Sequence, residues 1–98
     1  MVEVSVVVPV YNSEECLEEL CRQIGEALSG TTYELLLVND QSLDGSWAVI
    51  KRLCGMNRAL TGINLRKNAG QNNAIMCGLR RATGKYVAIM DDDLQHSP

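Results

Sequence analysis

Apolar residues along the chain are spaced in two alternating ways, and this alternation predicts the elements. Residues 4–8 form a continuous, mostly β-branched run closed by Pro9, which is typical of a fully buried strand. From Cys16 to Leu28, apolar side chains recur at steps of three and four residues, as in an amphipathic helix. The first part of the chain is therefore expected to be a strand followed by a helix.

Polar residues near the ends of this first helix suit those positions. Asn12 or Ser13 is expected to cap the start of the helix. Glu14 and Glu15 lie where the helix dipole favours negative charge, and Gly30 is expected to close the helix.

The same cycle repeats along the rest of the chain. Strands are predicted at residues 33–40, 60–65 and 85–90, of which the first and the last are expected to be buried, with helices around 47–54 and 74–82. Strands that alternate with helices across short turns indicate an α/β fold, in which helices cover both faces of a parallel sheet.

Composition narrows the class of protein. A chain of 98 residues fits one small domain, and 46% hydrophobic residues are ordinary for a globular protein. The net charge of −3 argues against a nucleic-acid partner, because no basic surplus is present to displace phosphate counterions. We expect neither a signal peptide nor a membrane span. The four cysteines contain no C-x-x-C pair, so reduced, buried thiols in a cytoplasmic setting are expected.

The topology gathers the polar residues that follow each strand at one edge of the sheet. In open α/β sheets, ligands bind beyond the carboxyl ends of the strands. The segments expected at this edge are PVYNSE, NDQS, RKNAGQNN and DDDLQ. The sequence lacks three motifs of common active sites. The first strand is not followed by the dinucleotide-binding motif G-x-G-x-x-G, and the chain has neither a P-loop nor the serine-hydrolase motif G-x-S-x-G. His96 is the only histidine, which excludes a multi-histidine zinc site within the chain.

The acidic triplet after the fourth strand is a candidate metal site. In extended backbone, Asp91, Asp93 and Gln95 point to one side and Asp92 points away. Two carboxylates about 4 Å apart repel by roughly 4 kcal/mol at an effective dielectric near 20. Mg²⁺ or Mn²⁺ would remove that repulsion and suits oxygen ligands. The alternative is a solvated loop or a helix cap.

Four other residues at this edge have both a functional and a structural interpretation. Asp40 either accepts a base N–H or forms a turn. Tyr11 either stacks on a base or packs against its neighbours. Arg66 and Lys67 either meet phosphates or are ordinary surface cations.

Together these segments resemble a known family. The stretches VSVVVPVYNSEECLEEL, YELLLVNDQSLDGS and LRKNAGQNNAIMCGLRRATGKYVAIMDDDLQ are similar to the amino-terminal half of family 2 glycosyltransferases with the GT-A fold. Within that family, NAGQNNAIMCGL and DDDLQHSP most resemble polyprenyl-phosphate glycosyltransferases. The resemblance implies a Rossmann-like nucleotide-diphospho-sugar transferase half, with three α/β/α layers and the strand order 3-2-1-4.

The resemblance also implies an inverting, metal-dependent transfer from a UDP- or GDP-linked sugar to a polyprenyl phosphate or glycan acceptor. The parent protein would then act at the cytoplasmic face of a membrane in cell-envelope glycan synthesis. The donor-binding residues that we expect are Pro9, Tyr11, Glu14 or Glu15, Asp40, Arg66 and Asp91, and the expected D-x-D metal ligands are Asp91, Asp93 and Gln95.

The chain departs from the family pattern at a few positions. Asn39 replaces a common second Asp, Gln41 stands where Gly or Asn is common, and Ser97 replaces a proline. Residues 1–98 are expected to be the nucleotide-sugar-binding part of a GT-A domain, ending after D-x-D, with acceptor-side elements and any catalytic base in a later segment. We expect such a chain to have little or no transferase activity by itself.

Two functional alternatives remain open from the sequence. The chain is either the donor-binding part of a glycosyltransferase or a non-catalytic nucleotide-binding or assembly module. A receiver-type phosphoacceptor fits poorly, because its acidic pair would follow the first strand, where this chain has Asn12 and Glu14. Apolar surface is expected to stay uncovered beside the fourth strand, with self-association through that edge.

Overall fold

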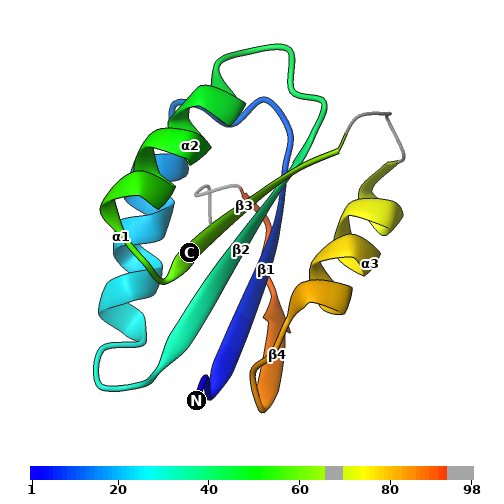
Figure 1. The fold of residues 1–98 in the computed structure, drawn as a ribbon. Coiled ribbons are helices and arrows are strands. Elements are labelled where there is room, and N and C mark those ends of the chain that lie inside the picture. Colours follow the sequence, from blue (N-terminus) through cyan, green and yellow to red (C-terminus); the bar gives the residue numbers. More distant parts are fainter. Residues whose placement is uncertain (66–69, 93–98) are drawn as a thin grey trace, which may run out of the picture.

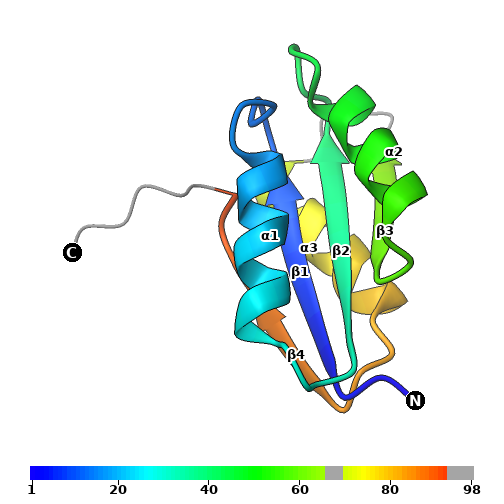
Figure 2. The same ribbon diagram turned by 90° about the vertical axis from the view of Figure 1, so that its left-hand side faces the viewer.

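The computed structural model describes residues 1–65 and 70–92 and confirms the predicted α/β fold. One parallel sheet has the strand order β3-β2-β1-β4, with two helices on one face and one on the other (Figures 1 and 2). The elements are β1 (Val4–Val10), α1 (Leu17–Ala27), β2 (Tyr33–Asp40), α2 (Ser46–Met56), β3 (Leu60–Leu65), α3 (Gly70–Arg81) and β4 (Tyr86–Ile89). Within the described ranges, no helix is long and apolar enough to span a membrane.

The two central strands form the core because helices cover both of their faces. Helices α1 and α2 lie on one face of the sheet, whereas α3 covers β1 and β2 from the other (Figure 2). This double covering explains why β1 and β2 are continuous apolar runs rather than alternating ones. The fully buried aliphatic residues include Val7, Val8, Val10, Leu35, Leu36, Leu37 and Val38.

Two glycines allow close packing around β1. A Cβ atom on Gly78 of α3 would lie 2.4 Å from Val7 Cγ1, and one on Gly84 would lie 2.6 Å from the Ser5 backbone nitrogen. Any larger residue at either position would therefore push α3 or the turn before β4 away from the sheet.

The predicted capping of α1 is wrong. The N-cap residue is Cys16, and no side chain caps the helix. The backbone carbonyl of Ser13 accepts from the amides of Cys16 and Leu17, at 3.0 and 3.2 Å. The side chains of Asn12 and Ser13 bond instead to residues that follow other strands, which makes them parts of the sheet edge.

The cysteines differ from one another in burial. The four cysteines, all among the described residues, form no disulfide; Cys21 is buried, and the other three are half-buried. Burial, together with the nearby Cys54 thiol, raises the pKa of Cys21 to about 11, and burial also raises the pKa of Cys54. Both thiols are therefore protonated near neutral pH.

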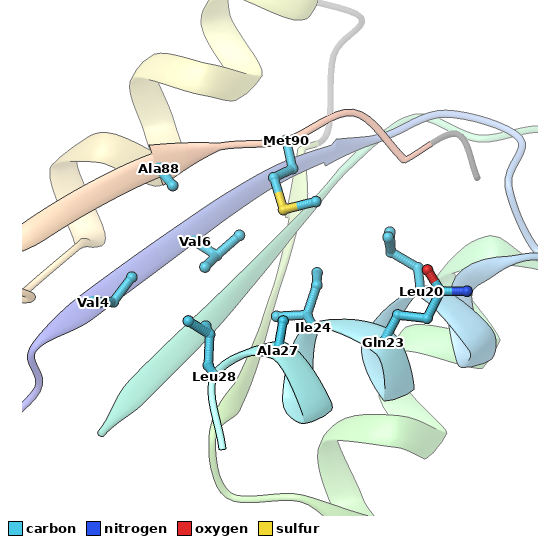
Figure 3. Close-up of a pocket in the computed structure, with 9 residues that line it drawn as sticks. All are labelled: Val4, Val6, Leu20, Gln23, Ile24, Ala27, Leu28, Ala88 and Met90. Carbon is cyan, nitrogen blue, oxygen red and sulfur yellow. The ribbon is translucent and has the colours of Figure 1, made fainter. Parts of the chain in front are cut away.

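Strand β4 is exposed, and its interpretation as a buried strand is wrong for the chain described here. Tyr86, Val87 and Ile89 are 58%, 45% and 50% exposed, because β4 lies at the edge of the sheet beside β1. An apolar groove of 290 Å³ runs between β4 and α1 (Figure 3). Its lining residues are Val4, Val6, Leu20, Gln23, Ile24, Ala27, Leu28, Ala88 and Met90. The expected uncovered apolar surface is therefore present.

Candidate functional site

The loops that follow β1 and β2 are joined by reciprocal hydrogen bonds at the carboxyl edge of the sheet. The Asn12 amide donates to Ser42 Oγ at 2.9 Å, and the Leu43 amide donates to Asn12 Oδ1 at 2.7 Å. Asn12 has a left-handed backbone, with φ of 52°, which asparagine tolerates better than most residues. Both loops lie at the top of the view in Figure 1. The topology therefore brings these two segments together as predicted.

A second group of hydrogen bonds holds the same loops at the start of α2. The Glu14 amide donates to Asp44 Oδ2 at 3.2 Å, and the Gly45 amide donates to Glu14 Oε1 at 2.8 Å. Ser46 Oγ accepts from the buried Ser13 amide at 2.8 Å and donates to Asp44 Oδ1 at 2.6 Å. Burial opposes ionisation of Asp44, but the hydrogen bonds from Ser46 and the Glu14 amide outweigh it and lower its pKa. The loops are thus pre-organised.

Asp40 at the end of β2 is a buried carboxylate with an unsatisfied oxygen. The residue is only 7% exposed, and Asp40 Oδ1 has no hydrogen-bond partner among the described residues. Leaving a buried acceptor unpaired costs about 1–3 kcal/mol, so such an atom calls for an explanation. A ligand N–H would satisfy it.

The neighbouring Asn39 has the opposite character, because its side chain is fully engaged within the chain. Asn39 Nδ2 donates to Asn64 Oδ1 at 2.9 Å, and Asn39 Oδ1 accepts from Ser42 Oγ at 2.6 Å. An asparagine can donate and accept at once, as both contacts require. The departure from Asp at this position therefore links the ends of β2 and β3 to the loop.

Gln41 continues the chain in a left-handed conformation, with φ of 55°. Such a backbone is strained for most residues with a Cβ atom and is adopted readily by glycine, and more easily by asparagine. The structure therefore supplies a physical reason why Gly or Asn would be common at this position.

The other residues expected in the donor pocket are distributed as follows. Pro9 is buried in β1 opposite Val38, whereas Tyr11 follows β1 and is 52% exposed, which leaves its ring accessible for stacking. Glu14 is exposed, and its carboxylate bonds to the Gly45 amide. Arg66 lies outside the described residues.

The expected metal ligands fall only partly within the described chain. Asp91 lies just beyond β4 and is exposed, while Asp93 and Gln95 lie outside the described residues. In the part that the structure describes, no three His, Cys, Asp or Glu side chains are placed to hold a metal ion. Of the three expected metal ligands, Asp91 is thus the one within the described residues, and its carboxylate oxygens suit Mg²⁺ or Mn²⁺.

Asp92 has a contact that the sequence reasoning missed. Its Oδ2 atom accepts from the Tyr11 amide at 2.9 Å and from the Ser13 hydroxyl. The signal that could have revealed this contact is the strand order. In the order 3-2-1-4 the carboxyl ends of β1 and β4 lie side by side, so residues that follow the two strands meet.

The parallel sheet in the order β3-β2-β1-β4, with helices on both faces, places the chain in the class of GT-A glycosyltransferase folds. The family model described as Glycosyl transferase family 2 matches residues 5–98, and the chain belongs to that family.

Among curated relatives, the chain is 38% identical over 96 residues to a dolichol-phosphate mannosyltransferase from Pyrococcus furiosus. It is 41% identical over 99 residues to an undecaprenyl-phosphate 4-deoxy-4-formamido-L-arabinose transferase from Enterobacter sp. (strain 638). Each match includes 98% of this chain but only 27% and 30% of the respective relative.

Solved structures of glycosyltransferases are also similar to this chain over part of their length. The mannosyltransferase PcManGT from Pyrobaculum calidifontis, in complex with GDP-Man and Mn²⁺, matches with a TM-score of 0.84 at 30% identity. TarS 1–349 from S. aureus, in complex with UDP-GlcNAc, matches with a TM-score of 0.81 at 28% identity. Both matches cover 93% of this chain, and 27% and 26% of the respective structures. The chain thus corresponds to about a quarter to a third of these relatives.

Proposed function

We propose that this chain is the donor-binding part of an inverting, metal-dependent glycosyltransferase that moves a sugar from a nucleotide-sugar to a polyprenyl phosphate. The observation that carries the proposal is the unpaired, buried Oδ1 atom of Asp40 at the carboxyl edge of the sheet. PcManGT in complex with GDP-Man and Mn²⁺, at 30% identity, and TarS 1–349 in complex with UDP-GlcNAc, at 28% identity, support it.

In this proposal the end of β2 and the loop after β1 bind the nucleotide base. Asp40 Oδ1 accepts an N–H of the base, and the exposed ring of Tyr11 stacks on its face. Pro9 limits the pocket from within β1, where it is buried. Uracil and guanine both present ring N–H donors, so this contact serves UDP and GDP alike.

The end of β4 provides the metal side of the proposed site. Asp91, with Asp93 and Gln95 as the further proposed ligands, would hold Mg²⁺ or Mn²⁺. When bound, the metal neutralises charge on the diphosphate leaving group. Arg66 is proposed to meet the phosphates from the segment after β3.

The proposed acceptor is a polyprenyl phosphate, in line with the dolichol-phosphate and undecaprenyl-phosphate named in the two curated relatives. A phosphate oxygen is already ionised near neutral pH and therefore needs less help from a general base than a sugar hydroxyl does. Because the chain spans less than a third of these relatives, we expect it to bind donor but to transfer little or no sugar.

The Asp40→Asn variant tests this proposal. The variant keeps the shape of the side chain but removes the charge-assisted hydrogen bond to the base, so we expect UDP or GDP affinity to fall about tenfold or more. Glu3→Gln is the matched control, because Glu3 is exposed at the opposite edge of the sheet. Equal affinity of Asp40→Asn and the unmodified chain, measured by calorimetry with Mn²⁺, would remove Asp40 from the base pocket.

A further inference from the structure

Asp92 joins the end of β4 to the loop that follows β1. Its Oδ2 atom accepts two hydrogen bonds, from the Tyr11 amide at 2.9 Å and from the Ser13 hydroxyl. Its backbone carbonyl accepts a third from Cys16 Sγ at 3.1 Å. One residue of the acidic triplet thus contacts three successive parts of the β1–α1 connection.

The sheet explains how this contact arises. Strands β1 and β4 are parallel neighbours, with Val7 opposite Ile89, and the Met90 amide donates to the Val7 carbonyl at 3.0 Å. The segment that leaves β4 therefore runs alongside the segment that leaves β1. Asp91 and Asp92 differ in their surroundings, because Asp91 is exposed whereas Asp92 is half-buried against the loop.

We propose that Asp92 is a positioning residue that fixes the base-binding loop to the metal-binding segment. The inference rests on the proposed function, which places Tyr11 on the nucleotide base and Asp91 on the metal. By accepting the hydrogen bond of the Tyr11 amide, Asp92 fixes the backbone position of Tyr11. Because Asp91 is the residue next to Asp92, the position of the tyrosine ring relative to Asp91 is fixed as well. The middle carboxylate of the triplet thus acts on the loop, whereas the exposed Asp91 stays available for the metal.

The strength of the contact comes from its charge. A carboxylate that accepts from an amide and a hydroxyl forms charge-assisted bonds, which are shorter and about twice as strong as neutral ones. An asparagine at position 92 keeps one acceptor oxygen and loses the charge, whereas an alanine removes both. The two substitutions therefore form a graded series.

The contact itself is tested without any nucleotide, by amide hydrogen exchange. In Asp92→Ala we expect the Tyr11 amide to exchange at least tenfold faster than in the unmodified chain. The Ser13 amide, which donates to Ser46 Oγ, should keep its protection, and Asp92→Asn should lie between the two. Unchanged protection of the Tyr11 amide in Asp92→Ala would overturn the contact.

The positioning role is tested by calorimetric titration of UDP and GDP, with and without Mn²⁺. If Asp92 holds the base and metal sides in one arrangement, Mn²⁺ and nucleotide bind cooperatively, and this coupling should fall several-fold in Asp92→Ala and be largely restored in Asp92→Asn. Glu3→Ala is the surface control. A general loss of structure would instead lower the thermal midpoint and weaken binding equally with and without Mn²⁺.

These two experiments separate the inference from the proposed function. Faster Tyr11 exchange with unchanged Mn²⁺–nucleotide coupling would overturn the positioning role and leave the proposed function intact. If the unmodified chain binds neither nucleotide, the proposed function is overturned, and so is the role of Asp92 in positioning the nucleotide-sugar site. The Tyr11 exchange rates would still decide whether Asp92 holds the loop.

Discussion

Burial of an unpaired oxygen of Asp40 lowers the stability of the folded chain, and a purely structural role would not require this loss. Its Oδ1 atom is buried and unpaired among the described residues, whereas the adjacent Asn39 satisfies both of its polar atoms. A buried acceptor kept without a partner is a common mark of a site that a ligand completes. Stability and binding should therefore respond in opposite directions when this carboxylate is changed.

We expect Asp40→Asn to raise the free energy of unfolding by about 1 kcal/mol while it weakens nucleotide binding, because an amide costs less to bury unpaired than a carboxylate. Urea unfolding of the nucleotide-free chain measures the first effect. A clear loss of stability in this variant would mean that the carboxylate has a structural role.

Gln41 offers a test of backbone strain at the same turn. With φ of 55°, Gln41→Gly should stabilise the chain by up to about 1 kcal/mol, because glycine avoids the Cβ clash of the left-handed region. Gln41→Ala is the control, since it removes the amide and keeps the Cβ atom. Urea unfolding should show a gain for glycine only, and an equal response of both variants would assign the effect to the side chain.

Among the elements, one carboxylate joins β1, β2 and the turn before β4 at the amino-terminal edge of the sheet. Glu34 Oε2 accepts from Ser5 Oγ at 2.5 Å, and from the Thr83 amide and hydroxyl at 2.7 and 3.1 Å. These bonds tie the turn between α3 and β4 to β1 and β2. Burial opposes ionisation of Glu34, but the bonds from Ser5 and Thr83 outweigh it, so its pKa lies below the ordinary value of 4.5.

This lowered pKa predicts a pH-dependent contribution to stability. The folded chain binds the proton on Glu34 less tightly than the unfolded chain, so the contribution is complete above pH 4.5 and is lost as the pH falls through the lower folded value. At pH 7, Glu34→Gln should cost about 1 kcal/mol. The difference from the unmodified chain, measured by urea unfolding, should shrink towards pH 3. A difference that stays constant over this range would contradict the assignment.

The uncovered edge of β4 leads to a prediction about association. Because no other described strand pairs with the outer edge of β4, and β4 exposes Val87 and Ile89, we expect the chain to self-associate, with a mass above 10.8 kDa in sedimentation equilibrium. Ile89→Lys should shift the population towards monomer, since a charge on an edge strand opposes pairing. A strictly monomeric mass for the unmodified chain would refute the prediction.

For the whole molecule, the sequence was enough to predict the order of elements and the edge that carries the candidate site. The continuous apolar runs at β1 and β2 and the helical spacing after them come from burial, which leaves a direct pattern in the sequence. Resemblance to a family supplied the strand order. The capping of α1 could not be predicted, because Asn12 and Ser13 bond to residues far along the chain, at positions 42, 43 and 92.

Local spacing alone could not predict the degree of burial of β4 or the direction of Asp92, for related reasons. An apolar edge strand and a buried one have the same local sequence, and only their neighbours differ. The contact from Asp92 to Tyr11 spans 81 residues and depends on two strands lying side by side. Local spacing contains no record of such a pairing.

Calorimetric titration of UDP and GDP, with and without Mn²⁺, tests whether this chain holds the donor side of a glycosyltransferase site. If the chain holds that site, at least one of the two nucleotides binds saturably, and the binding is strengthened by Mn²⁺ and weakened in Asp40→Asn. Absence of binding by both nucleotides under both conditions would contradict the presence of that site.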